Sequence, residues 1–240
     1  MASSSSVPSL MKDEEPRNWA KLPSELTSLI LTRLSVIDIL ENAQKVCKPW
    51  YCVCKDPSMW RKIDMQTLEE FLKKYDLESM CRNAVDRSQG GLLEIDIWHF
   101  GTDDLLNYIA DSNLRSLRLV LCSQITDKGV AKAVVKLPFL EELDISYCAF
   151  SGDSVRVLNN IAIAIGETMP ELRHLQLLWN EFDNMGLNAI LDGCPHLEHL
   201  DLSSCFNLRH DDAIEKRLSE RIEVLRLPDV STSSYSLCRQ

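Results

Sequence analysis

The stretch LRSLRLVLCSQITDKGV, residues 114–130, contains the pattern that decides most of the fold. Leucines stand at positions 114, 117 and 119, so the spacing is L-x-x-L-x-L, and Cys122 follows three residues after the last of them. Residues two apart on a β-strand point to the same face, so Leu117 and Leu119 predict a short strand with one apolar side. After this strand we expect the chain to turn under the core and return through a helix.

The same spacing recurs along the chain. It is found at Leu92-Ile95-Ile97, Leu114-Leu117-Leu119, Leu140-Leu143-Ile145, Leu172-Leu175-Leu177, Leu197-Leu200-Leu202 and Ile222-Leu225-Leu227. The starts lie 22, 26, 32, 25 and 25 residues apart, and leucine-rich repeats run about 20–29 residues. One repeat cannot bury its own apolar face, so neighbouring repeats stack around one core.

The position three residues after each last apolar residue supports this assignment. It holds Phe100, Cys122, Cys148, Asn180, Cys205 and Val230, and the repeat template expects Asn or Cys there. We therefore expect an α/β repeat fold over residues 91–228, with about six leucine-rich repeats, parallel inner strands and outer helices. The 32-residue interval predicts a longer return helix.

Residues 18–63 carry a different pattern, which predicts three short helices. Apolar residues recur at helical spacing through KLPSELTSLILTRLS, residues 21–35. Ser35 and Asp38 have the spacing of a capping box that opens a second helix. The Asp56-Pro57 pair ends a third, because a residue before proline avoids the α region. A unit this small is close to the size limit for independent folding, so we expect it to be stabilised by packing against a partner.

The remaining segments are assigned from composition and periodicity. Residues 64–90 contain two amphipathic stretches and are expected to form a helical connector. Residues 1–17 are expected to be a disordered polar tail, and residues 229–240 a second polar tail at the C-terminus.

Charge and cysteine content argue against several classes of function. The formal net charge of −10 disfavours nucleic acid and anionic membranes as partners. No apolar run approaches the roughly 18 residues of a membrane span, and the N-terminal segment lacks the apolar core of a secretory signal. Nine cysteines, an odd number, indicate reduced thiols and a location in the nucleus, the cytoplasm or both.

Two cysteine-rich stretches suggest metal sites, and their spacing argues against both. In C-x₄-C-x-C, residues 47–54, the last two cysteines would point about 200° apart on a helix. In CPHLEHLDLSSC, residues 194–205, Cys205 holds an inward repeat position while His199 alternates with Leu200 and faces the other side. The catalytic fingerprints of common enzyme classes are absent from the sequence. We expect no catalytic residue, no metal and no cofactor.

The N-terminal unit resembles an F-box. The resemblance is carried by Leu22-Pro23-x-x-Leu26, Ile30-Leu31-x-x-Leu34-Ser35, Asp38-Ile39-Leu40, Val46-Cys47-Lys48-x-Trp50 and Asp56-Pro57-x-x-Trp60. An F-box followed by cysteine-containing repeats resembles the plant F-box/LRR-repeat proteins, and the resemblance covers about residues 17–228.

This resemblance implies a non-catalytic, substrate-recognition subunit of an SCF-type cullin-RING ubiquitin ligase. In that family the F-box docks a Skp-family adaptor, which links it to the cullin and RING subunits. The repeats hold a protein substrate for ubiquitination and proteasomal degradation. The expected adaptor-binding residues are Leu22, Pro23, Leu26, Ile30, Leu31, Leu34, Ile39, Leu40, Val46, Cys47, Trp50 and Trp60.

The substrate is expected on the concave face of the repeats, where the residues that alternate with the inner leucines lie. These are Glu94, Asp96, Trp98, Arg118, Val120, Glu142, Asp144, His174, Gln176, Leu178, His199 and Asp201. Trp98 and Leu178 are large apolar groups at solvent-facing positions, with Tyr147 and Trp179 one residue beyond the face, and such groups anchor interfaces. The carboxylates favour a basic substrate segment.

Two alternative hypotheses remain. The chain could be a leucine-rich interaction scaffold that does not assemble a ligase, which a cullin pull-down would distinguish. It could instead be a zinc protein that uses the Cys/His stretch, which metal analysis of the purified protein would show.

Overall fold

The computed structural model of the chain describes residues 19–66, 69–148, 155–178, 182–205, 207–209 and 211–228. The two expected tails lie outside these ranges, as do Trp179, Asn180 and Val230. Of the helices within the described ranges, none combines the length and apolar character that crossing a bilayer requires.

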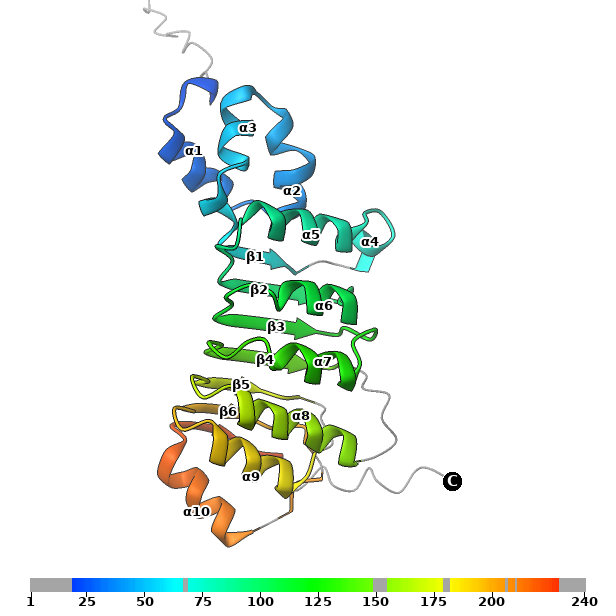
Figure 1. Cartoon of the computed structure of the whole chain (residues 1–240). Coiled ribbons are helices and arrows are strands. Elements are labelled where there is room, and N and C mark those ends of the chain that lie inside the picture. Colours follow the sequence, from blue (N-terminus) through cyan, green and yellow to red (C-terminus); the bar gives the residue numbers. More distant parts are fainter. Residues whose placement is uncertain are drawn as a thin grey trace, which may run out of the picture.

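A single parallel sheet runs the length of the repeat region. Its strands follow one another in sequence order, each hydrogen-bonded to the next (Figure 1). They are β1 (Lys62–Met65), β2 (Glu94–Trp98), β3 (Ser116–Val120), β4 (Glu142–Ser146), β5 (His174–Gln176), β6 (His199–Asp201) and β7 (Val224–Arg226). The six strands that the leucine spacing predicts are β2–β7, so the predicted repeat fold is confirmed.

Helices connect consecutive strands and stack beside one another along the sheet (Figure 1). They are α4 (Glu69–Leu72), α5 (Leu77–Arg87), α6 (Asp103–Ile109), α7 (Asp127–Val134), α8 (Val155–Thr168), α9 (Asn184–Gly193) and α10 (Asp212–Arg221). The 14-residue α8 occupies the longest interval between repeats, as predicted. Side-chain oxygens of Thr102, Thr126, Asp183 and Asp211 cap the first turns of α6, α7, α9 and α10.

The template leucines and the cysteines after the strands form one continuous core. The inner residues of β2–β6 are each 2% exposed or less. The buried thiols of Cys122, Cys148 and Cys205 donate to backbone carbonyls of the preceding repeat, with Sγ–O distances of 3.6, 3.7 and 3.0 Å respectively. These cysteines therefore satisfy buried carbonyls between repeats, which is a structural role.

The N-terminal unit contains the three predicted helices, α1 (Ser24–Leu31), α2 (Val36–Glu41) and α3 (Lys48–Cys54). Short 3₁₀ turns accompany them, namely η1 (Trp19–Lys21), η2 (Ala43–Lys45) and η3 (Pro57–Trp60). The Asp38 backbone N–H donates to Ser35 Oγ at 3.0 Å, which caps α2 as its spacing predicts. The Ser58 N–H donates to Asp56 Oδ1 at 2.9 Å and caps η3.

Strand β1 was not predicted, and it changes the domain boundary. It pairs with β2 from Lys62↔Glu94 to Met65↔Ile97, so the expected boundary between residues 63 and 64 falls inside a strand. The L-x-x-L-x-L spacing is also present at Trp60, Ile63 and Met65, where other apolar residues stand in place of leucine. All three side chains are at most 1% exposed. The leucine pattern missed this repeat because tryptophan and methionine replace two of its leucines.

Candidate functional site

Helix α1 turns three of its four large apolar residues outward, and only Leu31 is buried. Leu26 is 48% exposed and Leu29 64% exposed, with Ile30 beside them, whereas Thr27 is only 1% exposed. The Thr27 hydroxyl donates to the Pro23 carbonyl at 3.1 Å, so its burial leaves no unpaired hydroxyl proton. An amphipathic helix on an ordinary domain surface would present the opposite arrangement.

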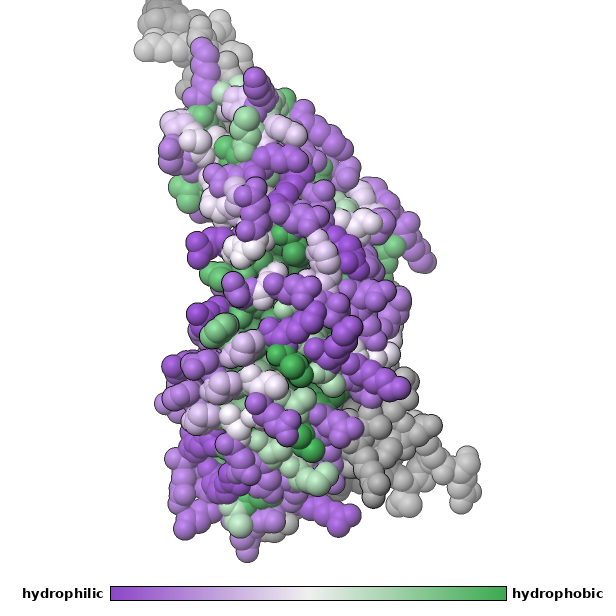
Figure 2. Space-filling view, viewed as in Figure 1, coloured by the Kyte–Doolittle hydropathy of each residue, from purple (hydrophilic) through white to green (hydrophobic). Residues whose placement is uncertain are grey.

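Exposed apolar residues are also found outside α1. Leu34 and Val46 are also exposed, and α1 contacts α3, whose Tyr51 is exposed as well. We call Leu26, Leu29, Ile30, Leu34 and Val46 the helical patch. Figure 2 shows apolar side chains among polar ones at this N-terminal, helical end of the molecule.

One polar atom in α3 is unpaired. The indole Nε1 of Trp50 is buried and has no hydrogen-bond partner among the residues that the structure describes. A buried indole N–H without an acceptor is uncommon.

The predicted adaptor-binding residues divide by exposure. Pro23, Leu26, Ile30, Leu34 and Val46 are exposed, and Leu22, Cys47 and Trp50 are half-buried. Leu31, Ile39, Leu40 and Trp60 lie in the core and have almost no surface to offer a partner, which corrects their assignment.

The sequence did not distinguish these four buried residues from the exposed ones, because helical spacing alone does not say which side of each helix the rest of the chain covers. Residues of α2 pack against α5 and β1, and Trp60 begins the first repeat. Exposed Leu29 and Tyr51 were not in the predicted set, although Leu29 stands beside the α1 stripe in the sequence.

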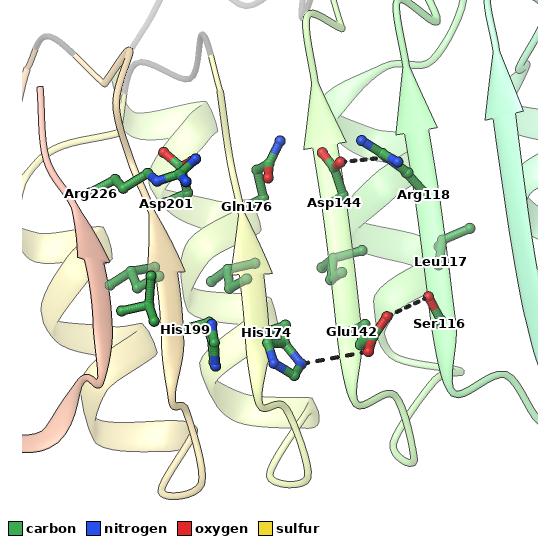
Figure 3. A pocket seen from close by; sticks show the side chains of 14 residues that line it. Ser116, Leu117, Arg118, Glu142, Asp144, His174, Gln176, His199, Asp201 and Arg226 are labelled. Carbon is green, nitrogen blue, oxygen red and sulfur yellow. Dashed lines mark hydrogen bonds and ion pairs between the residues drawn. The ribbon is translucent and has the colours of Figure 1, made fainter. Parts of the chain in front are cut away.

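The second candidate surface is the face of the sheet opposite the buried leucines, which is the face that the sequence predicts to be concave and to bind the substrate. We call it the outer face. It carries two rows of side chains that alternate with the buried leucines. The first row holds Lys62, Glu94, Ser116, Glu142, His174, His199 and Val224, and the second holds Asp64, Asp96, Arg118, Asp144, Gln176, Asp201 and Arg226. Part of both rows lines a hollow of about 400 Å³ over β3–β7 (Figure 3).

Arg118 is shared by two carboxylates of the second row. Its Nε donates to Asp144 Oδ2 at 2.8 Å (Figure 3). Its Nη1 lies 3.6 Å from Asp96 Oδ2. Asp96 also accepts from Gln66 Nε2 at 2.8 Å. Burial raises the pKa of both the Asp96 and the Asp144 carboxyl above the usual range, although Arg118 and the hydrogen bonds oppose this shift.

Contacts continue across the later strands. Arg226 Nη1 lies 3.3 Å from Asp201 Oδ2, and Ser116 Oγ donates to Glu142 Oε2 at 3.1 Å. His174 Nδ1 lies 3.6 Å from Glu142 Oε1, and the His174 and His199 ring centroids are 4.3 Å apart (Figure 3). The outer face is therefore a network of paired polar groups.

The predicted substrate-binding residues lie on or beside this face, with one correction. Val120 lies on this face between Trp98 and Ser146 in the sheet register, but it is only 5% exposed and so offers a partner almost no surface. Trp98 and Leu178 are half-buried. The Trp98 indole Nε1 donates to Asp96 Oδ1 at 2.8 Å, which holds the ring against the face.

The structure separates the cysteines and histidines of residues 194–205. Cys194 and Cys205 are buried, His196 is exposed and His199 lies on the outer face, as the repeat register predicts. Among the described residues, a different group could hold a cation: ligand atoms of His174, Glu198 and His199 lie within 4.8 Å of one another. Glu198 there already pairs with Arg173 at 2.5 Å. That the chain carries no metal stays a prediction.

Comparison with known proteins identifies both parts of the chain. Residues 19–66 match the F-box-like family, and residues 102–222 match the family described as FBD-associated F-box protein At5g56370, LRR repeats. The chain is 58% identical to putative F-box/LRR-repeat protein 23 of Arabidopsis thaliana, over 95% of this chain and 57% of that protein. It is 57% identical to the Arabidopsis F-box protein SKIP19, over 96% of this chain and 84% of that protein. It is 49% identical to putative F-box/LRR-repeat protein 9, over 86% of this chain and 96% of that protein.

The fold and these matches define an F-box protein with leucine-rich repeats. The chain belongs to the F-box/LRR-repeat family of plants. Membership implies, in general terms, a substrate-adaptor role in SCF ubiquitin ligases, and proteins of this family are generally non-catalytic adaptors.

Proposed function

We propose that this chain is the substrate-recognition subunit of an SCF-type ubiquitin ligase and acts without catalytic residues of its own. The F-box docks a Skp-family adaptor, and through it the cullin and RING subunits. The repeats hold a protein substrate for ubiquitination and degradation by the proteasome. We place this activity in the nucleus, the cytoplasm or both, where thiols stay reduced.

The helical patch is the observation that supports this proposal. Several large apolar side chains exposed on one short helix and the turns beside it are typical of an interaction site. Burying each large aliphatic side chain of the patch against a partner contributes about 1.5–3 kcal/mol. Three such side chains on α1 alone thus supply several kcal/mol of binding free energy, provided that the partner offers a matching apolar groove.

Adaptor binding is tested with charged substitutions on the exposed side of α1. Leu26→Asp combined with Leu29→Asp should abolish co-purification of a co-expressed Skp-family adaptor, because both side chains are exposed and neither supports the core. We expect affinity to fall by at least about 100-fold, the equivalent of about 3 kcal/mol.

The matched control is Val135→Asp with Met185→Asp, which changes two exposed apolar residues of the repeats, one directly after α7 and one on α9. It should leave adaptor binding intact. Equal adaptor recovery with both variants would show that the helical patch is not the docking surface.

Ligase assembly distinguishes the proposal from the scaffold hypothesis. A pull-down of the unmodified chain should recover cullin together with the adaptor. Recovery of neither protein would favour a leucine-rich interaction scaffold that does not assemble a ligase.

A further inference from the structure

The outer sheet face carries its negative charge on one half. Over β1–β4 the two rows hold five carboxylates against two cations, Lys62 and Arg118, which leaves three negative charges in excess. Over β5–β7 the charged side chains of the rows, with histidines counted as neutral, are Asp201 and Arg226, which pair with each other. The half of the face next to the F-box is therefore acidic, and the far half is neutral.

Both cations on the acidic half are already engaged. Lys62 Nζ lies 2.8 Å from Glu94 Oε2, and Arg118 forms ion pairs with both Asp96 and Asp144. Asp64 and Glu142 are exposed, and they border a second hollow of about 250 Å³ that lies over β1–β4. A cationic side chain from a partner would meet uncompensated carboxylates here.

Bulky side chains line the edge of the same half where the strands end. Leu121 is 40% exposed and Tyr147 46% exposed, while Trp98 and His99 are half-buried beside them with ring centroids 6.2 Å apart. We call Trp98, His99, Leu121 and Tyr147 the ledge. Each follows or ends one of three consecutive strands, β2, β3 or β4.

The backbone of the ledge repeats an unfavourable conformation. His99, Leu121 and Tyr147 have φ angles of 73°, 57° and 57°, in the left-handed region that bulky residues rarely adopt. Their N–H groups donate to Val120, Ser146 and Leu178 carbonyls at 2.9, 3.0 and 3.3 Å, each in the following repeat. Backbone strain is therefore present in three successive turns. Each of these turns has a large side chain at a position where glycine would be less strained.

Trp98 joins the ledge to the acidic rows. Its Nε1 donates to Asp96 at 2.8 Å, and the Arg118 guanidinium lies 5.9 Å from the centre of its ring. Because these contacts hold the ring in place before any partner arrives, binding against it loses little conformational entropy.

The geometry points to a specific class of substrate segment: a stretch of partner protein with Lys or Arg beside a bulky apolar residue, bound over β1–β4. The basic side chains lie over Asp64, Asp96 and Glu142, and the apolar residue contacts the ledge. This inference rests on the proposed function, because it names what the repeats of the ligase subunit recognise. Nucleic acid and anionic membranes are repelled by the same carboxylates.

The test measures peptide binding to the purified full-length chain by fluorescence anisotropy. Three labelled peptides of about 12 residues share a Gly/Ser background; one carries Arg and Leu, one has Glu for Arg, and one has Ser for Leu. The Arg/Leu peptide should bind at least about tenfold more tightly than either of the others. Its affinity should fall as salt concentration rises, since surface charge interactions are screened.

Paired substitutions locate the site. Asp64→Asn with Glu142→Gln removes two exposed charges and leaves the Arg118 cluster intact, and should weaken the Arg/Leu peptide by about tenfold or more. Leu121→Ser with Tyr147→Ser should weaken it as well. The control, Glu167→Gln with Glu171→Gln, makes the same charge change at exposed residues away from the sheet face and should have no effect.

Each contrary result overturns the inference. These are equal binding of the three peptides, no measurable binding of the Arg/Leu peptide, or unchanged affinity in the Asp64→Asn, Glu142→Gln variant. Adaptor co-purification is measured on the same preparations. Adaptor binding without selectivity for the basic peptide rejects this inference alone, and selective peptide binding without the adaptor rejects the proposed ligase function alone.

Discussion

At the scale of single residues, Arg118 has the most consequential position on the outer face. One guanidinium compensates two half-buried carboxylates, Asp96 and Asp144, and the raised pKa of each carboxyl reflects its burial. A raised pKa in the folded state means that the folded chain binds protons more readily than the unfolded chain. Burial of each ionised carboxyl therefore lowers the free energy of unfolding. This loss is complete at pH values above the raised pKa, and it disappears as the pH falls toward the usual pKa of an aspartate.

Replacing Arg118 by methionine should therefore destabilise the protein in a pH-dependent way. At pH 7 we expect a loss of about 1–2 kcal/mol, the cost of uncompensated carboxylates reduced for their partial exposure. Urea denaturation at several pH values should show the difference from the unmodified chain shrinking toward about pH 4.

Arg115→Met is the matched control, since Arg115 pairs with the exposed Glu141 at 2.7 Å. A surface pair of this kind is worth less than about 1 kcal/mol. If the Arg118→Met difference were the same at every pH, the two carboxylates would not be its cause.

At the scale of elements, α8 and α9 approach each other closely through their backbones at two glycines. A Cβ on Gly193 would overlap the Gly166 carbonyl, and a Cβ on Gly166 would overlap the Ala189 carbonyl. Backbone atoms cannot rotate away as side chains do, so glycine is required at this crossing. The long α8 is thus accommodated by close packing against its neighbour.

Gly193→Ala should destabilise the chain by about 2–3 kcal/mol, although alanine is the better helix former. Thermal or urea unfolding measures this loss. Met185→Ala on the same helix, where the side chain is exposed, should change stability by less than about 0.5 kcal/mol. A stable Gly193→Ala protein would mean that α8 and α9 can separate at no cost.

At the scale of the whole molecule, β1 makes the F-box and the repeats one structure. Trp60 ends the F-box motif and also starts the first repeat, and β1 pairs with β2. In a stacked array each unit contacts chiefly its neighbours, so a change propagates along the stack from where it is made.

Ile63→Ala should accordingly loosen both sides of β1, at a cost of about 2–4 kcal/mol for a buried isoleucine. Hydrogen exchange should rise in α2 and α3 as well as in β2 and α6. Leu200→Ala in β6 should raise exchange around β5–β7 and leave the F-box unchanged. Faster exchange on only one side of β1 in the Ile63→Ala variant would show that the two parts fold independently.

Sequence patterns were sufficient to predict the repeat, its register, the helical N-terminal unit and the inward cysteines. These follow from periods of two and of 3.6 residues, which any short segment displays locally. The patterns did not reveal β1, where Trp60 and Met65 replace the leucines of the template. Nor did they separate exposed Leu26 and Leu29 from buried Leu31, because three positions on one short helix look alike until the packing of α2, α3 and α5 is known.

Which surfaces are exposed, and how their charges combine, depends on the packing of the folded chain. The sharing of Arg118 between Asp96 and Asp144 joins residues of three strands that are 22 and 26 positions apart along the chain. The ledge depends on left-handed turns in three successive repeats, which no local pattern specifies for His, Leu and Tyr. Burial, charge compensation and strain are properties of neighbours in space, and so they are settled only when the repeats stack.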